Sequence, residues 1–121
     1  MVDDDSFSLE LAVRALEKLG CDAYPVKSAF EAMQRLQRDR FDMVVIDYMM
    51  PGTNGIEATR QLRRIPSVAS VPVLMMTSES RRDVIVESRQ AGVNDFLLKP
   101  LQMSTLASKL TLHLGRNQEQ P

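Results

Sequence analysis

The chain has 121 residues, of which 44% are hydrophobic and 26% are charged, and its net charge at pH 7 is -1. This length and composition are typical of one globular domain with a single core, and the balanced charge excludes the strongly basic surface that nucleic-acid binding requires. The single cysteine excludes an internal disulfide, no apolar run approaches the roughly 20 residues of a membrane span, and the acidic amino terminus does not match an export signal, so we expect a cytoplasmic protein.

Short apolar runs alternate with helical patterns along the chain. The first expected strand runs into Asp3 and is short, because only Met1 and Val2 precede that residue. Ser6 or Ser8 is expected to cap the first helix. The other expected strands are 21–26, 43–47, 72–76 and 95–98, and the expected helices are 9–19, 29–36, 55–62, 81–91 and 103–114.

This alternation predicts βαβ units and an α/β domain with a doubly wound parallel sheet of five strands and five helices. Pro25 has no backbone N–H, so we expect strand 21–26 at an edge of the sheet. Right-handed crossovers place the carboxyl ends of all strands at one edge, where open α/β sheets bind ligands.

Polar side chains follow the strands at that edge. The apolar run Val44–Ile46 leads into Asp47, the first strand supplies Asp3–Asp5, the fourth ends at Thr77 and the fifth at Lys99. Converging carboxylates need a cation to remain ionised together, and hard oxygen ligands suit Mg²⁺. With a hydroxyl and an ammonium nearby, such a site would bind a phosphoryl group, and Asp47 would be the nucleophile that carries it.

Four motifs in this order resemble a response-regulator receiver domain of the chemotaxis-regulator type. They are VDDD at 2–5, VVIDYMMPGTNG at 44–55, LMMTS at 74–78 and FLLKP at 96–100. The resemblance covers Met1 to about Leu114 and leaves 115–121 as a tail or the start of a linker. It implies a flavodoxin-like five-stranded parallel sheet in the order 2-1-3-4-5.

The resemblance also implies roles for individual residues. Asp47 would be the phosphoacceptor, and Mg²⁺ would be held by Asp3, Asp4, Asp47 and the backbone carbonyl of Met49. Asp4 would be the direct ligand of the acidic pair, and Asp3 would act largely through water. The Met49 side chain occupies a position that tunes the lifetime of the phosphorylated state in this family, and we expect slow self-dephosphorylation because it cannot hydrogen-bond the attacking water.

By the same resemblance, Thr77 is the switch hydroxyl, Phe96 the switch aromatic residue, and Lys99 the lysine that pairs with the phosphoryl group. Pro100 matches a position that usually follows a cis peptide bond. The consecutive apolar residues Val84–Val86 cannot all face one core in a helix, so we expect at least one to be exposed on a partner-binding face with Phe96.

The implied partners are a sensor histidine kinase or a phosphotransfer protein as donor, and an output partner or effector domain that the sequence does not identify. A homodimer is a further possibility, and we expect neither direct nucleic-acid binding nor a membrane contact. The protein would not be an enzyme, because it would only assist its own phosphorylation and dephosphorylation.

Other interpretations exist for each motif taken alone. Asp3–Asp5 could be a solvated terminal run, Asp47 a helix cap or turn residue, Thr77 and Ser78 the cap of the following helix, and Lys99 an exposed lysine. We expect His113 to be exposed and to have no role in phosphoryl transfer.

Three other functions compete for the whole chain. A phosphatase with an aspartyl nucleophile would need an acid where Met49 stands, and a flavodoxin-like electron carrier would not place Asp3–Asp5 in a phosphate-binding loop. A receiver fold that serves as a phosphorylation-independent protein-interaction module is the main alternative.

Overall fold

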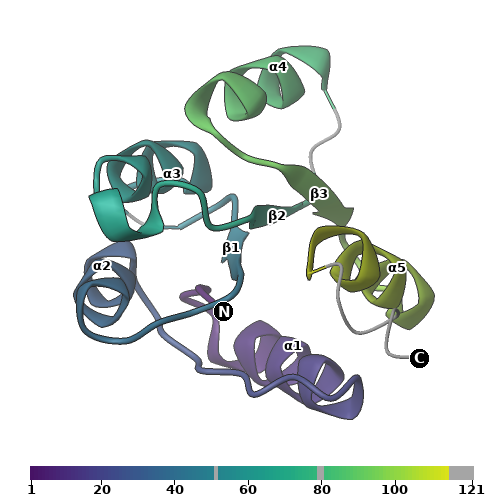
Figure 1. Ribbon diagram of the computed structural model, residues 1–121. Helices are drawn as coiled ribbons and strands as arrows, with labels where there is room; N and C mark the ends of the chain where they lie inside the picture. Colours follow the sequence, from purple (N-terminus) through teal and green to yellow (C-terminus); the bar gives the residue numbers. More distant parts are fainter. Residues whose placement is uncertain (51, 79–80, 115–121) are drawn as a thin grey trace.

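The computed structural model describes residues 1–50, 52–78 and 81–114. Helices and strands alternate along most of this part of the chain, as predicted, but no strand lies between the first two helices (Figure 1). The expected tail 115–121 lies outside the described residues. The elements are α1 (Ser6–Lys18), α2 (Ala29–Arg38), β1 (Val44–Asp47), α3 (Gly55–Arg63), the 3₁₀ helix η1 (Pro66–Val68), β2 (Val73–Thr77), α4 (Arg82–Ala91), β3 (Asp95–Leu98) and α5 (Met103–Leu114).

The sheet contains three parallel strands in the order β1-β2-β3. Val2 extends this order beyond β1 by single parallel bridges to Ile46 and Val26. The spatial sequence Val26, Val2, β1, β2, β3 agrees with the expected order, but the prediction of five strands is not confirmed within the described residues. Val2 makes only these single bridges, so within the described residues segment 21–26 has a pairing partner only near Val26.

The helices form two layers on the sheet. In Figure 1, α1 and α5 lie on one side of the strands, and α2, α3 and α4 lie on the other. Alternate strand residues point to opposite faces, so neighbouring side chains join different cores. On the α1 and α5 side, the buried strand residues are Val45, Leu74, Met76 and Leu97. On the other side they are Val44, Ile46, Val73 and Met75.

Local signals determine where the helices begin and end. Asp5 caps α1 by accepting a hydrogen bond from the Ser8 N–H, so the prediction of Ser6 or Ser8 as the cap is wrong. Ser6 and Ser8 lie within the helix because the Asp5 carboxylate already satisfies one of its first N–H groups. Ser28 caps α2, and Gly92 ends α4 with a φ of 110°.

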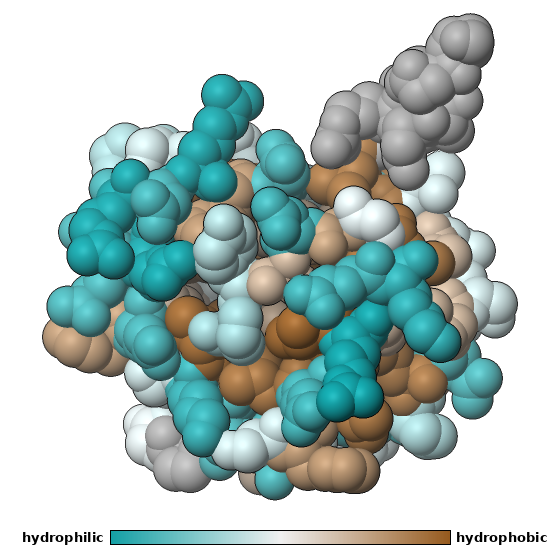
Figure 2. Space-filling view, turned by 90° about the horizontal axis from the view of Figure 1, so that it is seen from below, coloured by the Kyte–Doolittle hydropathy of each residue, from teal (hydrophilic) through white to brown (hydrophobic). Residues whose placement is uncertain are grey.

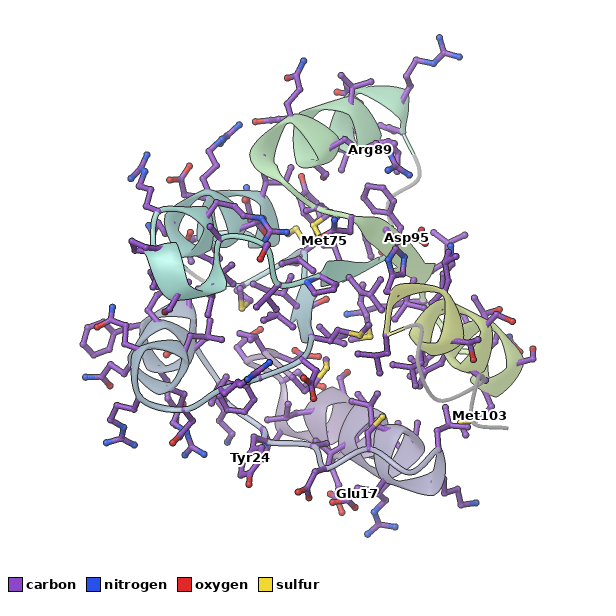
Figure 3. All side chains as sticks on the ribbon, viewed as in Figure 1. Glu17, Tyr24, Met75, Arg89, Asp95 and Met103 are labelled. Carbon is purple, nitrogen blue, oxygen red and sulfur yellow. The ribbon has the colours of Figure 1, made fainter. Side chains whose placement is uncertain are left out.

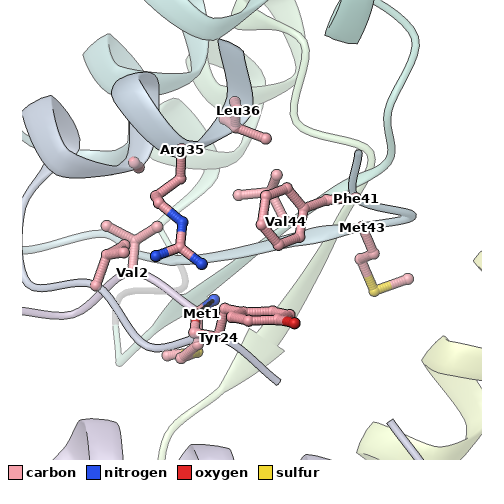
Figure 4. A pocket seen from close by; sticks show the side chains of 10 residues that line it. Met1, Val2, Tyr24, Arg35, Leu36, Phe41, Met43 and Val44 are labelled. Carbon is pink, nitrogen blue, oxygen red and sulfur yellow. Dashed lines mark hydrogen bonds between the residues drawn. The ribbon is translucent and has the colours of Figure 1, made fainter. Parts of the chain in front are cut away.

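Two cavities flank the amino terminus. The smaller, of about 40 Å³, lies among the side chains of Met1, Tyr24, Arg35 and Phe41 (Figure 4). The larger measures about 540 Å³. Its lining includes Leu16, Cys21, Tyr24, Met43, Val45 and Leu110. The space-filling view from the α1 side shows apolar atoms exposed near the middle of a mostly hydrophilic face (Figure 2).

None of the described helices combines the length and the apolar composition that crossing a membrane requires.

Candidate functional site

Three carboxylates meet at the carboxyl end of β1. The Val2 N–H donates to the Val45 carbonyl at 2.8 Å, and the Asp47 N–H donates to the Val2 carbonyl at 2.9 Å. These bonds hold the chain that carries Asp3 and Asp4 beside the last residue of β1. Asp3, Asp4 and Asp47 each offer a carboxylate oxygen, and these oxygens lie within 4.8 Å of one another. The predicted convergence of the acidic pair with Asp47 is present, whereas Asp5 is used as a helix cap.

Among these three carboxylates, Asp3 is the one whose negative charge is most destabilised by its surroundings. Its side chain is fully buried, Oδ1 accepts a hydrogen bond from the Asp5 N–H at 3.0 Å, and Oδ2 has no hydrogen-bond partner. Burial raises the pKa of Asp3, and the neighbouring Asp47 carboxylate raises it further, while the Asp5 N–H opposes this shift. A buried oxygen without a partner costs free energy, and a cation beside it would remove that cost. The donor set therefore fits a hard divalent cation such as Mg²⁺.

Lys99 approaches Asp47 from the end of β3. Its Nζ lies 2.7 Å from Asp47 Oδ1. That oxygen has no hydrogen-bond partner of good geometry, so the contact is an ion pair. The Lys99 N–H donates to the Thr77 carbonyl at 3.0 Å, which fixes the backbone from which the lysine extends. The peptide bond between Lys99 and Pro100 is cis, as the resemblance implied.

Thr77 and Phe96 lie on one face of the sheet. Thr77 is the buried last residue of β2, where it is paired with Leu98, and Met75 is paired with Phe96. Since alternate residues share a face, Thr77 and Phe96 both point toward the α4 side. The N-cap of α4 is Arg81, so the alternative that Thr77 or Ser78 caps this helix is wrong.

The loop after β1 closes against the strand through Gly55. The Gly55 N–H donates to the Tyr48 carbonyl at 2.8 Å. A Cβ on Gly55 would lie 2.7 Å from the Asp47 carbonyl oxygen, so only glycine fits there. The Met49 side chain is 67% exposed in this loop. The sequence reasoning missed the role of Gly55, although the Asn54-Gly55 pair is a common turn signal.

A second charged cluster joins β3 to α5. Asp95 accepts contacts from Lys109 Nζ at 2.7 Å and from His113 Nε2 at 2.8 Å. Burial raises the pKa of the Asp95 carboxyl, but hydrogen bonds from His113, Lys109 and the Phe96 N–H outweigh it and hold that pKa at about 2. The expectation that His113 is exposed is therefore wrong, because its partner lies 18 residues earlier in the chain.

The apolar run of α4 is divided between core and surface. Val84 is buried, Ile85 is half-buried and Val86 is 48% exposed. The prediction that at least one of these side chains is exposed is confirmed.

Comparison with known proteins gives consistent matches over nearly the whole chain. The family model of the response regulator receiver domain matches residues 1–111. The chemotaxis protein CheY-3 of Vibrio cholerae serotype O1 is 36% identical over 111 residues, which are 91% of this chain and 85% of that protein.

Solved structures agree with these sequence matches. The V. cholerae chemotaxis protein CheY4 superposes with a TM-score of 0.88 at 27% identity, covering 93% of both chains. The receiver domain of the sensor histidine kinase PA1611 from Pseudomonas aeruginosa, with a magnesium ion coordinated in its active site cleft, has a TM-score of 0.86 at 27% identity and covers 94% of this chain and 93% of that one.

Proposed function

The chain belongs to the family of response regulator receiver domains, and from this membership we propose that it is a phosphorylation-dependent switch whose phosphoacceptor is Asp47. The donor would be the phosphohistidine of a sensor kinase or of a phosphotransfer protein. One observation carries the proposal: Asp47 is next to the Lys99 ammonium and, at the same time, to the Asp3 and Asp4 carboxylates.

Asp3, Asp4, Asp47 and the backbone carbonyl of Met49 would hold Mg²⁺. The unpartnered buried oxygen of Asp3 supports this assignment, and so does the magnesium ion in the related receiver domain of PA1611. When bound, the ion would neutralise the carboxylates and the negative charge on the phosphoryl oxygens.

The chain's own side chains supply the remaining chemistry. An Asp47 carboxylate oxygen attacks phosphorus, the P–N bond of the phosphohistidine breaks, and its electron pair stays on the departing imidazole. The Lys99 ammonium, already 2.7 Å from Asp47, then has a phosphoryl oxygen within reach. In this transfer the protein is itself the substrate that is phosphorylated. It would therefore assist its own phosphorylation without being an enzyme.

The output would begin at Thr77, whose hydroxyl would move to the phosphoryl group, and continue through Phe96 on the same face of the sheet. Around Phe96, the surface formed by α4, β3 and α5 exposes Val86 and Leu98. We assign the output partner, the effector domain or a second copy of the chain to this surface.

The test is phosphoryl incorporation from acetyl phosphate with Mg²⁺, followed by intact mass spectrometry. Wild type and Asp83→Ala, which removes an exposed carboxylate on α4, are expected to gain one phosphoryl group, whereas Asp47→Ala gains none. Equal incorporation in wild type and Asp47→Ala would refute Asp47 as the acceptor. Absence of incorporation in wild type would favour the phosphorylation-independent interaction module.

A further inference from the structure

Phe96 is held from two sides by neighbouring helices. Its N–H donates to the Asp95 carboxylate at 2.8 Å, and Lys109 and His113 anchor that carboxylate to α5. Its half-buried ring faces α4, where the guanidinium carbon of Arg89 lies 5.3 Å from the ring centroid. Figure 3 shows Arg89 and Asp95 near the outer strand β3, with Met75 further inside the sheet. The backbone of Phe96 is therefore fixed by α5, and its ring is fixed by α4.

Few other contacts determine the position of the Arg89 guanidinium. Nη1 donates to the Asn94 carbonyl at 3.3 Å, and no carboxylate among the described residues pairs with Arg89. The carboxylate of Glu87, in the same helix, instead accepts a hydrogen bond from Arg60 at 3.2 Å. The Phe96 ring and one carbonyl thus account for the placement of the Arg89 cation.

The path from Phe96 toward Thr77 leads away from Arg89. Phe96 is paired with Met75, and Thr77 lies two residues further along β2 on the same face. α4 runs in the opposite direction, so Arg89 in its last turn is near the start of β3 rather than near Thr77. A ring that turns along the strand toward Thr77 must leave the guanidinium.

We propose that Arg89 is a positioning residue of the switch, which holds the Phe96 ring in the rotamer of this structure and so limits the activated population before phosphorylation. The inference rests on the proposed function, because it needs Phe96 to have a second, activated rotamer. A cation–π contact at an exposed site is worth about a two- to five-fold change in an equilibrium. Removing it shifts the unphosphorylated protein toward the activated state by that factor.

The experiment follows the Phe96 ring by NMR in protein with isotope-labelled phenylalanine. The chain has only four phenylalanines, and Phe96→Leu assigns the signal. Each protein is measured with Mg²⁺ alone and with Mg²⁺ and beryllofluoride, which mimics the phosphoryl group. Arg89→Met keeps the length of the side chain without its charge, Arg89→Lys restores a cation, and Arg82→Met removes an exposed arginine elsewhere on α4.

With Mg²⁺ alone, the Phe96 signal of Arg89→Met is expected to move toward its beryllofluoride position by a two- to five-fold population change. Arg89→Lys should recover part of the wild-type position, and Arg82→Met should match wild type. An unchanged signal in Arg89→Met, with a normal beryllofluoride response, would overturn the role of Arg89 and leave the proposed function standing. No beryllofluoride response in wild type would overturn the proposed switch, and the role of Arg89 with it.

Discussion

The two halves of the sheet are supported very differently, although both deliver residues to the same site. β1, β2 and β3 form a continuous parallel register, and every residue of β1 and β2 is buried. On the other side of β1, Val2 and Val26 contribute one bridged residue each. The ladder of β1, β2 and β3 carries Asp47. The weakly paired half, which consists of Val2 and Val26, carries the acidic pair that follows Val2.

This difference separates the proposed phosphoacceptor from its proposed metal ligands. In a parallel ladder, alternate residues direct their N–H and C=O groups to opposite neighbours. The Val45 carbonyl accepts a hydrogen bond from the Val2 N–H, and Val45 also lines the larger cavity. Asp47 is therefore placed by the core of the protein, while the position of Asp3 depends on the few bonds around Val2.

The largest expected effect comes from truncating the ladder. Leu74 on β2 is fully buried in the α1 and α5 side of the core. Leu74→Ala should lower the free energy of unfolding by about 2–5 kcal/mol, because it removes apolar burial and leaves a cavity. Urea unfolding at equilibrium measures this change. A loss below 1 kcal/mol would contradict the view that the ladder carries the stability of the fold.

A substitution in the weakly paired half of the sheet should change stability less than Leu74→Ala does, but it should weaken metal binding more. Val2 is 2% exposed, and Val2→Ala should cost about 1–3 kcal/mol through lost burial. Because Val2 positions Asp3, we also expect Mg²⁺ affinity to fall about tenfold, as when outer-shell support of a metal site is removed. Calorimetry on the folded protein measures this affinity, with intact mass confirming that Met1 is retained.

Val68→Ala is the matched control, since it removes the same two methyl groups from a residue that is 4% exposed and lies in η1. Its cost in stability should be similar, and its Mg²⁺ affinity should equal that of wild type. Equal Mg²⁺ affinities for Val2→Ala and wild type would show that Asp3 does not depend on the Val2 bridges.

The sequence predicted the ladder well for the same reason that the ladder is stable. Runs such as Val44–Ile46 are apolar because both of their faces are covered, and that pattern is visible without a structure. Strand 21–26 was overpredicted, because strand formation there depends on whether a neighbouring strand extends beside it. No local pattern within that segment reports the length of its neighbour.

The candidate site shows the same division. The rule that parallel strands end at one edge of a sheet predicted that four side chains would lie close together, those of Asp3, Asp4, Asp47 and Lys99. The contact between His113 and Asp95 was missed, since pairing between a helix and a distant strand leaves no periodic signal in the sequence.

The pH dependence of the free energy of unfolding should depend on the Met1 amine, which lies in the weakly paired half of the sheet beside Val2. The Met1 ammonium donates to the Tyr24 carbonyl, and burial lowers its pKa from 8.0 to about 6. Between these values the unfolded chain binds more protons than the folded one, so the free energy of unfolding should rise by about 2 kcal/mol from pH 6 to pH 8. Urea unfolding across this range measures the slope.

The control for the Met1 amine is the N-terminally acetylated chain. Acetylation keeps an N–H that can donate to the Tyr24 carbonyl but removes the charge, so this part of the slope should vanish. The side chains are the same in both forms, so their contributions cancel in the difference. Identical slopes would mean that Met1 is solvated and that this half of the sheet is looser than the structure indicates.

The smallest expected effect leaves both halves intact and changes only the loop that joins β1 to α3. Met49 is 67% exposed in the loop that follows Asp47, the proposed phosphoacceptor, and its side chain cannot hydrogen-bond a water molecule that would attack an aspartyl phosphate. Met49→Asn should accelerate the loss of phosphate a few-fold, which corresponds to less than about 1 kcal/mol in the barrier. The decay of phosphorylated protein after removal of acetyl phosphate measures the rate, and Met49→Leu serves as an apolar control. A common rate for all three proteins would show that this side chain does not control the water, and that the lifetime is determined by the residues on the ladder itself.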